Sequence, residues 1–190
     1  MSDMLNHNQL RQGTRVEIDE LPWIIVDAQF VKPGKGQAFT KIKIKNLIDG
    51  RVIERTFKSS ENVIKADVVD RDMQFLYNDG AYWHFMDPAS YEQSALDETQ
   101  VGETRFWLKE QETYLVTLWK NRAIAVMPPS FVILTITQCD PGIKGDTVSG
   151  ATKPATLETG AEVKVPLFIN EGERIRVDTR TGQYVERAKD

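Results

Sequence analysis

Cysteine and histidine are scarce in this chain of 190 residues, and their scarcity excludes several kinds of site. Cys139 is the one cysteine, so no internal disulfide can form, which fits a reducing compartment. With His7 and His84 as the only histidines, neither a Cys/His metal cluster nor a Ser/His/Asp triad can be argued from the sequence. We therefore expect no metal site and no cofactor, and we expect Cys139 to pack at a strand end rather than act as a nucleophile.

Long hydrophobic runs and a secretory signal are also missing. The longest apolar runs, such as Ala123 to Met127, fall far short of the roughly 20 residues that span a bilayer. The N-terminus, Met1 to Asn6, has no basic segment followed by an apolar one. We expect a cytoplasmic protein without a membrane partner, and we expect it to be a monomer.

The net charge of −4 is unusual for a nucleic-acid binder, but it is unevenly distributed. Residues 1–65 hold 11 Lys and Arg against 8 Asp and Glu (+3), residues 66–127 hold 5 against 11 (−6), and residues 128–190 hold 8 against 9 (−1). Such a molecule can place its basic end against phosphates while its acidic middle limits indiscriminate binding. The excess of +3 is modest, so this support is weak.

The hydrophobic pattern predicts β-strands almost throughout the chain. We expect an all-β protein of three units, at residues 1–65, 66–128 and 129–190. The last boundary follows from Pro128-Pro129, because two prolines cannot continue a central strand. Short strands without a helical period indicate a small closed SH3-like barrel in the first unit. The other two units have similar lengths and patterns, which suit oligonucleotide/oligosaccharide-binding (OB) barrels.

Three segments are expected to lie outside the strands. The polar stretch Ser59 to Asn62 should link the first two units. Pro88 to Thr99 resembles a loop or a short helix, and Asp140 to Thr152 is rich in Gly, Ser, Thr and Pro and should form a long loop. Asp49-Gly50 and Asn78-Asp79-Gly80 are strong hairpin turns.

The chain's most distinctive stretch runs from Phe30 to Phe39, where Lys35 stands between Gly34 and Gly36 at an expected hairpin tip. Both glycines can take positive φ and let the backbone approach a partner closely, while Pro33 stiffens the stem. The strand that follows should place Ala38, Thr40, Ile42 and Ile44 on one face and Phe39, Lys41, Lys43 and Lys45 on the other. An ordinary surface hairpin remains the alternative for an arbitrary sequence of this kind.

The setting of Lys35 limits the chemistry that it can perform. A glycine-flanked tip offers no burial to depress a lysine pKa, as a Schiff-base or general-base lysine would need. The stretch also lacks the spacing of a phosphate-binding loop and does not open a helix. An exposed lysine on a stiff stem is better suited to probe a narrow RNA-lined cavity, or to be modified.

Several motifs together resemble the bacterial elongation factor P family. They are the stretch Phe30 to Phe39, Asn78-Asp79-Gly80, Trp83-His84-Phe85-Met86, Val126-Met127-Pro128-Pro129, Asp140 to Thr147, and Lys153 to Gly160. The resemblance runs from about Gly13 to Arg187, and the motifs follow the family's order. It implies an N-terminal SH3-like (KOW-like) barrel and two OB barrels in an elongated, L-shaped molecule with a tRNA-like outline.

The resemblance also implies a function, which is not enzymatic. Members of this family are translation factors that bind the ribosome between the peptidyl-tRNA (P) and exit (E) sites and relieve stalling at consecutive prolines. In the branch with this loop the matched lysine is lengthened by β-lysylation, which points to Lys35. The partners implied are the rRNA and exit-site proteins of the ribosome, the P-site peptidyl-tRNA, and enzymes that modify Lys35. Branches with arginine at this position, and the elongation-factor-P-like group that lacks this loop, match less well.

The site residues expected from the loop and the family motifs fall into three groups. Contacts to tRNA or rRNA are expected from Lys32, Pro33, Gly34, Lys35, Gly36, Lys41 and Lys43, and from Tyr184 and Arg187 in the C-terminal hairpin. Contacts to the exit-site codon are expected from Gly145, Asp146 and Thr147. Plainer interpretations are a solvated strand face for the lysines, a flexible connector for 145–147, and barrel packing for Tyr184.

Two alternatives to the translation factor remain open. A general RNA-binding module without a role at proline would bind in a salt-sensitive way and would survive loss of the lysine's extension. A lysine-dependent enzyme would show a depressed Lys35 pKa. The aromatic residues Trp83 and Phe85 could stack on bases, but alternating aromatics in a strand are more often part of a core.

Overall fold

The first of three consecutive antiparallel sheets carries the basic third of the chain. In the computed structural model, which describes residues 3–141 and 150–188, its strand order is β1-β6-β2-β3-β4-β5. The strands are β1 (Met4–Asn6), β2 (Arg15–Ile18), β3 (Leu21–Val31), β4 (Phe39–Asn46), β5 (Val52–Lys58) and β6 (Asn62–Lys65), with the 3-10 turn η1 (His7–Gln9) after β1. Trp23, Ile25, Ile42 and Ile44 are buried in its core.

The expected link at Ser59 to Asn62 is wrong. Strand β6 pairs with both β1 and β2, so residues 59–62 lie within the first unit. The chain crosses to the second sheet immediately after β6, at residues 66 and 67. The pairing partner β1 had no signal in the sequence, because a strand of three residues is too short to show a period of two.

The middle sheet has the order β11-β10-β7-β8-β9. Its strands are β7 (Val68–Asn78), β8 (Tyr82–Met86), β9 (Gln93–Asp97), β10 (Thr113–Trp119) and β11 (Arg122–Met127). Between β9 and β10 lie the helix α1 (Glu98–Val101) and the 3-10 helix η2 (Gly102–Trp107). The segment expected as a loop or short helix therefore contains a strand as well, and Phe85 and Leu96 pack in the core that this strand helps to close.

The C-terminal sheet has the order β14-β13-β12-β15-β16. Its strands are β12 (Phe131–Cys139), β13 (Thr152–Leu157), β14 (Glu162–Pro166), β15 (Arg174–Asp178) and β16 (Gln183–Arg187). Strand β13 was not expected, because Pro154 argues against a strand in a sequence. Cys139 lies at the end of β12 and is packed against the core, as expected.

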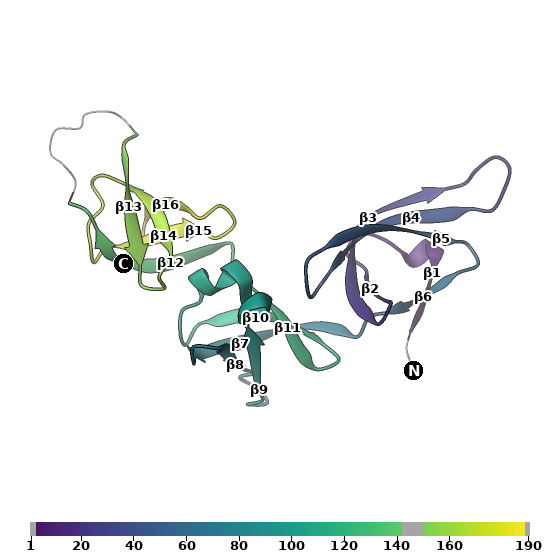
Figure 1. Ribbon diagram of the computed structural model, residues 1–190, viewed down its shortest axis with the longest axis horizontal. Coiled ribbons are helices and arrows are strands. Elements are labelled where there is room, and N and C mark those ends of the chain that lie inside the picture. The colour runs from purple at the N-terminus through teal and green to yellow at the C-terminus, as the bar shows by residue number, and fades with distance from the viewer. Residues whose placement is uncertain (1–2, 142–149, 189–190) are drawn as a thin grey trace.

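The three barrel-like sheets follow one another in an elongated, bent, nearly all-β molecule (Figure 1). The basic first unit and the C-terminal unit lie at opposite ends, with the acidic unit between them. No helix in residues 3–141 and 150–188 is long and apolar enough to cross a membrane.

Ion pairs join the first unit to the middle unit. Arg15 on β2 donates to Asp70 on β7 at 2.5 Å, and Lys120 reaches Glu17 at 3.0 Å. Asp70 also accepts a hydrogen bond from the Thr117 hydroxyl at 2.9 Å, which fixes the carboxylate that receives Arg15. The Arg15–Asp70 ion pair therefore joins the first unit to a carboxylate whose position is already fixed within the middle unit.

Candidate nucleic-acid interface at the lysine hairpin

The lysine loop connects the two longest strands of the first unit. Strands β3 and β4 pair from Trp23 with Asn46 out to Val31 with Phe39, so the pairing continues to the edge of the loop. Residues 32–38 form the tip of this hairpin, which projects away from the other two units (Figure 1). The extended ladder provides the stiff stem that the sequence predicted.

The backbone of the tip uses one of its two glycines for a conformation that other residues avoid. Gly36 has φ +114°, whereas Gly34 is outside the left-handed region. A Cβ on Gly36 would also lie 3.8 Å from Cγ of Pro33, while a Cβ on Gly34 would meet open space. The expectation that both glycines could take positive φ is therefore met by Gly36 alone.

Lys35 is exposed at this tip, and so are its neighbours from Gly34 to Gln37. Lys32 is exposed and Pro33 is half-buried at the start of the loop. Where the structure describes the chain, no three His, Cys, Asp or Glu side chains gather as a metal site would require. The tip presents a cation and hydrogen-bond donors to a partner from outside the fold.

The alternating lysines of β4 lie on the outer face of the sheet, as predicted. Lys41, Lys43 and Lys45 are exposed, while Thr40, Ile42, Ile44 and Asn46 between them are buried. Their cross-strand neighbours differ. Lys41 lies between Gln29 and Thr56, whereas Lys43 lies between Asp27 and Glu54. Since neighbouring carboxylates offset a positive charge, Lys41 is the better phosphate contact of the two.

An aromatic contact that the sequence analysis did not predict lies at the loop end of the hairpin stem. His7 in η1 stacks on Phe30 of β3, with ring centroids 5.8 Å apart, and its carbonyl accepts a hydrogen bond from the Thr40 hydroxyl at 3.4 Å. The N-terminal turn thereby contacts both strands of the hairpin. This contact could not be predicted from the sequence, because His7 lies far from Phe30 along the chain.

The C-terminal residues expected at the site lie in a different unit from Lys35. Tyr184 on β16 is half-buried against the C-terminal core. Arg187 is engaged by its own unit: it pairs with Glu173 at 2.8 Å, donates to the Phe168 carbonyl at 3.0 Å, and lies 5.0 Å from the centroid of the Phe168 ring. Tyr184 and Arg187 therefore do not form one site with the lysine hairpin. The expected codon contacts, Gly145, Asp146 and Thr147, lie outside the described residues.

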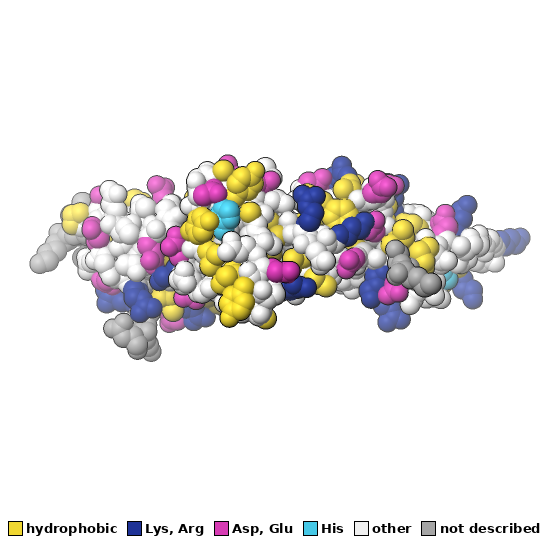
Figure 2. All heavy atoms as spheres, turned by 90° about the horizontal axis from the view of Figure 1, so that it is seen from below, with side chains coloured by type: hydrophobic (Ala, Val, Ile, Leu, Met, Phe, Trp, Pro, Cys, Tyr) yellow, Lys and Arg dark blue, Asp and Glu magenta, His cyan; other side chains and the backbone are white. Residues whose placement is uncertain are grey.

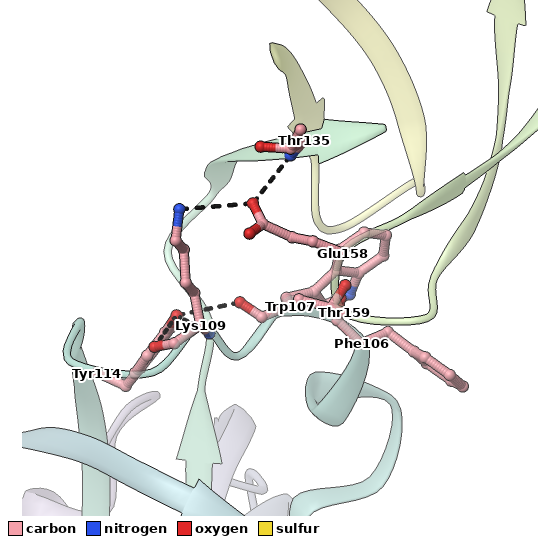
Figure 3. Close-up of polar contacts among 7 residues, drawn as sticks. All are labelled: Phe106, Trp107, Lys109, Tyr114, Thr135, Glu158 and Thr159. Carbon is pink, nitrogen blue, oxygen red and sulfur yellow. Dashed lines mark hydrogen bonds and ion pairs between the residues drawn. The ribbon is translucent and has the colours of Figure 1, made fainter. Parts of the chain in front are cut away.

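The middle and C-terminal units contact each other through residues to which the sequence analysis assigned no role (Figure 3). The Thr159 hydroxyl donates to the Phe106 carbonyl at 2.6 Å. Glu158 accepts from the Thr135 N–H at 2.9 Å and pairs with Lys109 at 3.4 Å. Phe106 and Trp107, at the end of η2, pack against the C-terminal core. These contacts join a 3-10 helix to a hairpin turn of the next unit.

Two solved structures resemble this one in fold. "Eukaryotic translation initiation factor 5A from Methanococcus jannaschii" has a TM-score of 0.56 at 24% identity, covering 66% of this chain and 95% of that chain. "Translation initiation factor eif-5a family protein from Naegleria fowleri ATCC 30863" has a TM-score of 0.54 at 17% identity, covering 66% and 96%. The fold is thus one found in translation factors.

The sequence comparisons are more specific. Family models match in three consecutive parts: the elongation factor P KOW-like domain at residues 6–63, the elongation factor P OB domain at 68–126, and the elongation factor P C-terminal model at 132–187. An "Elongation factor P" from Magnetococcus marinus is 69% identical over 186 residues, covering 98% of this chain and all of that protein. The chain belongs to the elongation factor P family, and it is a translation elongation factor, not an enzyme.

Proposed function

We propose that this factor binds the ribosome between the P and E sites and stimulates peptide bond formation where consecutive prolines stall it. The position of Lys35 is the observation that supports this function: it is exposed at the tip of a projecting, fully paired hairpin. A hairpin tip can enter a narrow RNA-lined cavity that a folded domain cannot, and a lysine adds a cation at its end.

The mechanism we propose is positional. Proline has a fixed φ and a proline run is stiff, so the peptidyl and aminoacyl ends meet in productive geometry only rarely. A factor that holds the acceptor end of the P-site tRNA removes part of that entropic barrier. In this proposal Lys35, lengthened by β-lysylation by dedicated enzymes in the cytoplasm, contacts the acceptor end, and Gly36 shapes the tip that presents it.

The other expected residues are ranked by their surroundings. Lys32 and Lys41 are proposed as phosphate contacts, because both are exposed and the cross-strand neighbours of Lys41 are uncharged. Lys43 contributes less, since it lies between two acidic residues. In the C-terminal unit, Arg187 must leave its contacts with Glu173 to bind tRNA, so its contribution is weaker still. We retain 145–147 as proposed contacts to the exit-site codon.

The test is the rate of peptide bond formation through a three-proline message on purified ribosomes. Native, modified protein should raise this rate, and Lys35→Ala should return it to the rate without factor, while a proline-free message is unaffected. Lys164→Ala is the matched control, because Lys164 is also exposed but lies on β14 in the C-terminal unit. Equal rates with and without native protein would refute the proposal and favour a general RNA-binding module.

The phosphate contacts are tested separately by ribosome binding at several salt concentrations. Lys41→Ala should weaken binding and lower the salt slope by about 1, as the loss of one phosphate contact does. Lys43→Ala should change both quantities less, because Asp27 and Glu54 flank it. Equal effects of the two substitutions would contradict the ranking by neighbouring charge.

A further inference from the structure

The outer surface of the β7–β8 hairpin carries exposed aromatic side chains that the proposed function does not use. Tyr77 pairs across the strands with His84, and Tyr82 lies two residues before His84 on the same face of β8. Tyr77 is 46% exposed and Tyr82 is 48% exposed. We call Tyr77, Tyr82 and His84 the tyrosine–histidine face. Figure 2 shows hydrophobic side chains gathered around a histidine over the middle of the molecule, with acidic side chains nearby.

This face is held in place by a chain of contacts. The rings of Tyr77 and His84 stack with centroids 4.6 Å apart and an interplanar angle of 24°. His84 Nε2 lies 2.7 Å from an oxygen of Asp79. The other oxygen of Asp79 accepts hydrogen bonds from the N–H groups of Ala81 at 2.9 Å and Tyr82 at 2.8 Å. The hairpin turn therefore orients Asp79, Asp79 orients His84, and His84 supports the Tyr77 ring.

Two carboxylates neighbour the residues of this face. Asp79 contacts His84, and Asp97 is the cross-strand partner of Tyr82. The hydrogen bond from His84 is the largest of the effects that lower the pKa of Asp79, to about 2, so its carboxylate is ionised at neutral pH. The surrounding unit, residues 66–127, holds 5 Lys and Arg against 11 Asp and Glu. This surface favours a cationic ligand and disfavours the phosphates of RNA.

Aromatic rings elsewhere in the chain show which cation suits such a surface. Within residues 3–141 and 150–188, six cation–π contacts occur, and each joins a ring to an Arg or Lys of the same unit; the rings are those of Trp23, Phe106, Trp119, Phe131 and Phe168. Five of the six use arginine. None of the six falls on the tyrosine–histidine face. An arginine from a partner could stack on a ring there while pairing with Asp79 or Asp97.

We propose that the tyrosine–histidine face binds arginine side chains presented by a basic segment of a protein partner. The acidic charge of the middle unit attracts the segment, the exposed tyrosines stack on its guanidinium groups, and the two carboxylates pair with them. This interaction is independent of the lysine hairpin, which lies in a different unit. The two functions can therefore fail separately.

The experiment is a titration of the full-length, isotope-labelled protein, followed by NMR on the tyrosine rings and His84. The probe is the acetylated, amidated peptide (Arg-Gly-Gly)3 at low salt, and its lysine counterpart is the comparison. We expect shifts at Tyr77, Tyr82 and His84 with the arginine peptide, weaker shifts with the lysine peptide, and loss of both as salt is raised.

Two variants test whether the peptide binds at the tyrosine–histidine face. The double substitution Tyr77→Ala/Tyr82→Ala should weaken binding of the arginine peptide about tenfold, as expected when central aromatic contacts are removed. Tyr91→Ala is the matched control, because Tyr91 is 72% exposed in the same unit but lies in the turn after β8. Both tyrosines of the double variant are exposed, and backbone amide spectra verify that the variant is folded.

Three results would overturn the proposal. A decamer of uridine that shifts these resonances when the peptide does not would make this a nucleic-acid surface. Equal peptide affinity in the double variant and the native protein would show attraction by overall charge alone. Shifts confined to other residues, or no shifts at all, would show that the face does not bind arginine. None of these results depends on Lys35 or on the ribosome.

Discussion

Removing the Tyr114 hydroxyl should loosen the structure on which the C-terminal unit rests. Tyr114 is 4% exposed, and its hydroxyl accepts a hydrogen bond from the Lys109 N–H at 2.7 Å and donates to the Trp107 carbonyl at 3.2 Å. It thus satisfies backbone groups in the segment formed by the end of η2 and the residues just after it (Figure 3). That segment carries Trp107 against the core of the C-terminal unit and Lys109 to its partner Glu158.

The size of the effect follows from the groups left without partners. Tyr114→Phe removes both hydrogen bonds while keeping the ring, and it leaves a backbone donor and a backbone acceptor unsatisfied. An unsatisfied buried polar group costs about 1–3 kcal/mol. Water can satisfy the carbonyl of the half-buried Trp107, so the cost is that of one unsatisfied group, the Lys109 N–H. A loss of 1–3 kcal/mol corresponds to about a 5- to 150-fold change in a local opening equilibrium.

Hydrogen exchange at the Lys109 amide is the direct assay, because unfolding of a three-unit protein need not be two-state. We expect this amide to exchange about 5- to 150-fold faster in Tyr114→Phe, in line with the loss estimated above. Tyr82→Phe is the matched control, since it removes the hydroxyl of an exposed ring. Unchanged exchange at Lys109 would refute the reasoning that the hydroxyl is what protects this amide.

The remaining predictions concern the tip, the acidic turn and the unit interface. Gly36→Ala should cost about 1–3 kcal/mol because φ is +114°, while Gly34→Ala should be tolerated, and denaturation of the first unit measures both. The Asp79 carboxyl should titrate at about 2, and in His84→Ala its pKa should move toward 3.8. Since the folded-state value is the lower one, this group stabilises the fold above about pH 3.8 and the contribution is lost as the pH falls through about 2, as NMR titration can follow. Thr159→Val should cost about 1 kcal/mol and increase motion between the last two units, as residual dipolar couplings would show.

Much of the fold could be predicted because local rules and tertiary structure agree. Gly50 and Gly80 both have positive φ in turns that Asp49-Gly50 and Asn78-Asp79-Gly80 had marked. The alternation along β4 placed its lysines outward, because a strand that is buried on one face must show a period of two. The hairpin tip could also be predicted from the sequence, since Pro33 and Gly36 act through their own backbone preferences.

Two strands, β1 and β13, could not be predicted from the sequence. Strand β13 contains Pro154, yet it pairs with both β12 and β14; the pairing with β12 covers Ala155 to Leu157, so Pro154 is paired with β14 alone. Strand β1 is only three residues long and is defined by its pairing with β6. The hydrogen bonds of β1 come from a segment distant in sequence, and those of β13 come from the strands on both sides of it, so neither strand was evident from its own residue pattern.

The candidate surfaces also differ in how far they could be predicted from the sequence. The sequence alone determined that Lys35 stands on a stiff, glycine-flanked tip, because that property is local. Only the tertiary structure decided where Tyr77 points: strict alternation would place it with buried Phe75, but the register shifts between these two residues and Tyr77 turns outward. The pairing with Glu173 that restrains Arg187, and the contact between Thr159 and Phe106, likewise join separate strands or units. Such contacts form only when the chain has folded, because the partners are brought together by packing and not by their spacing in the sequence.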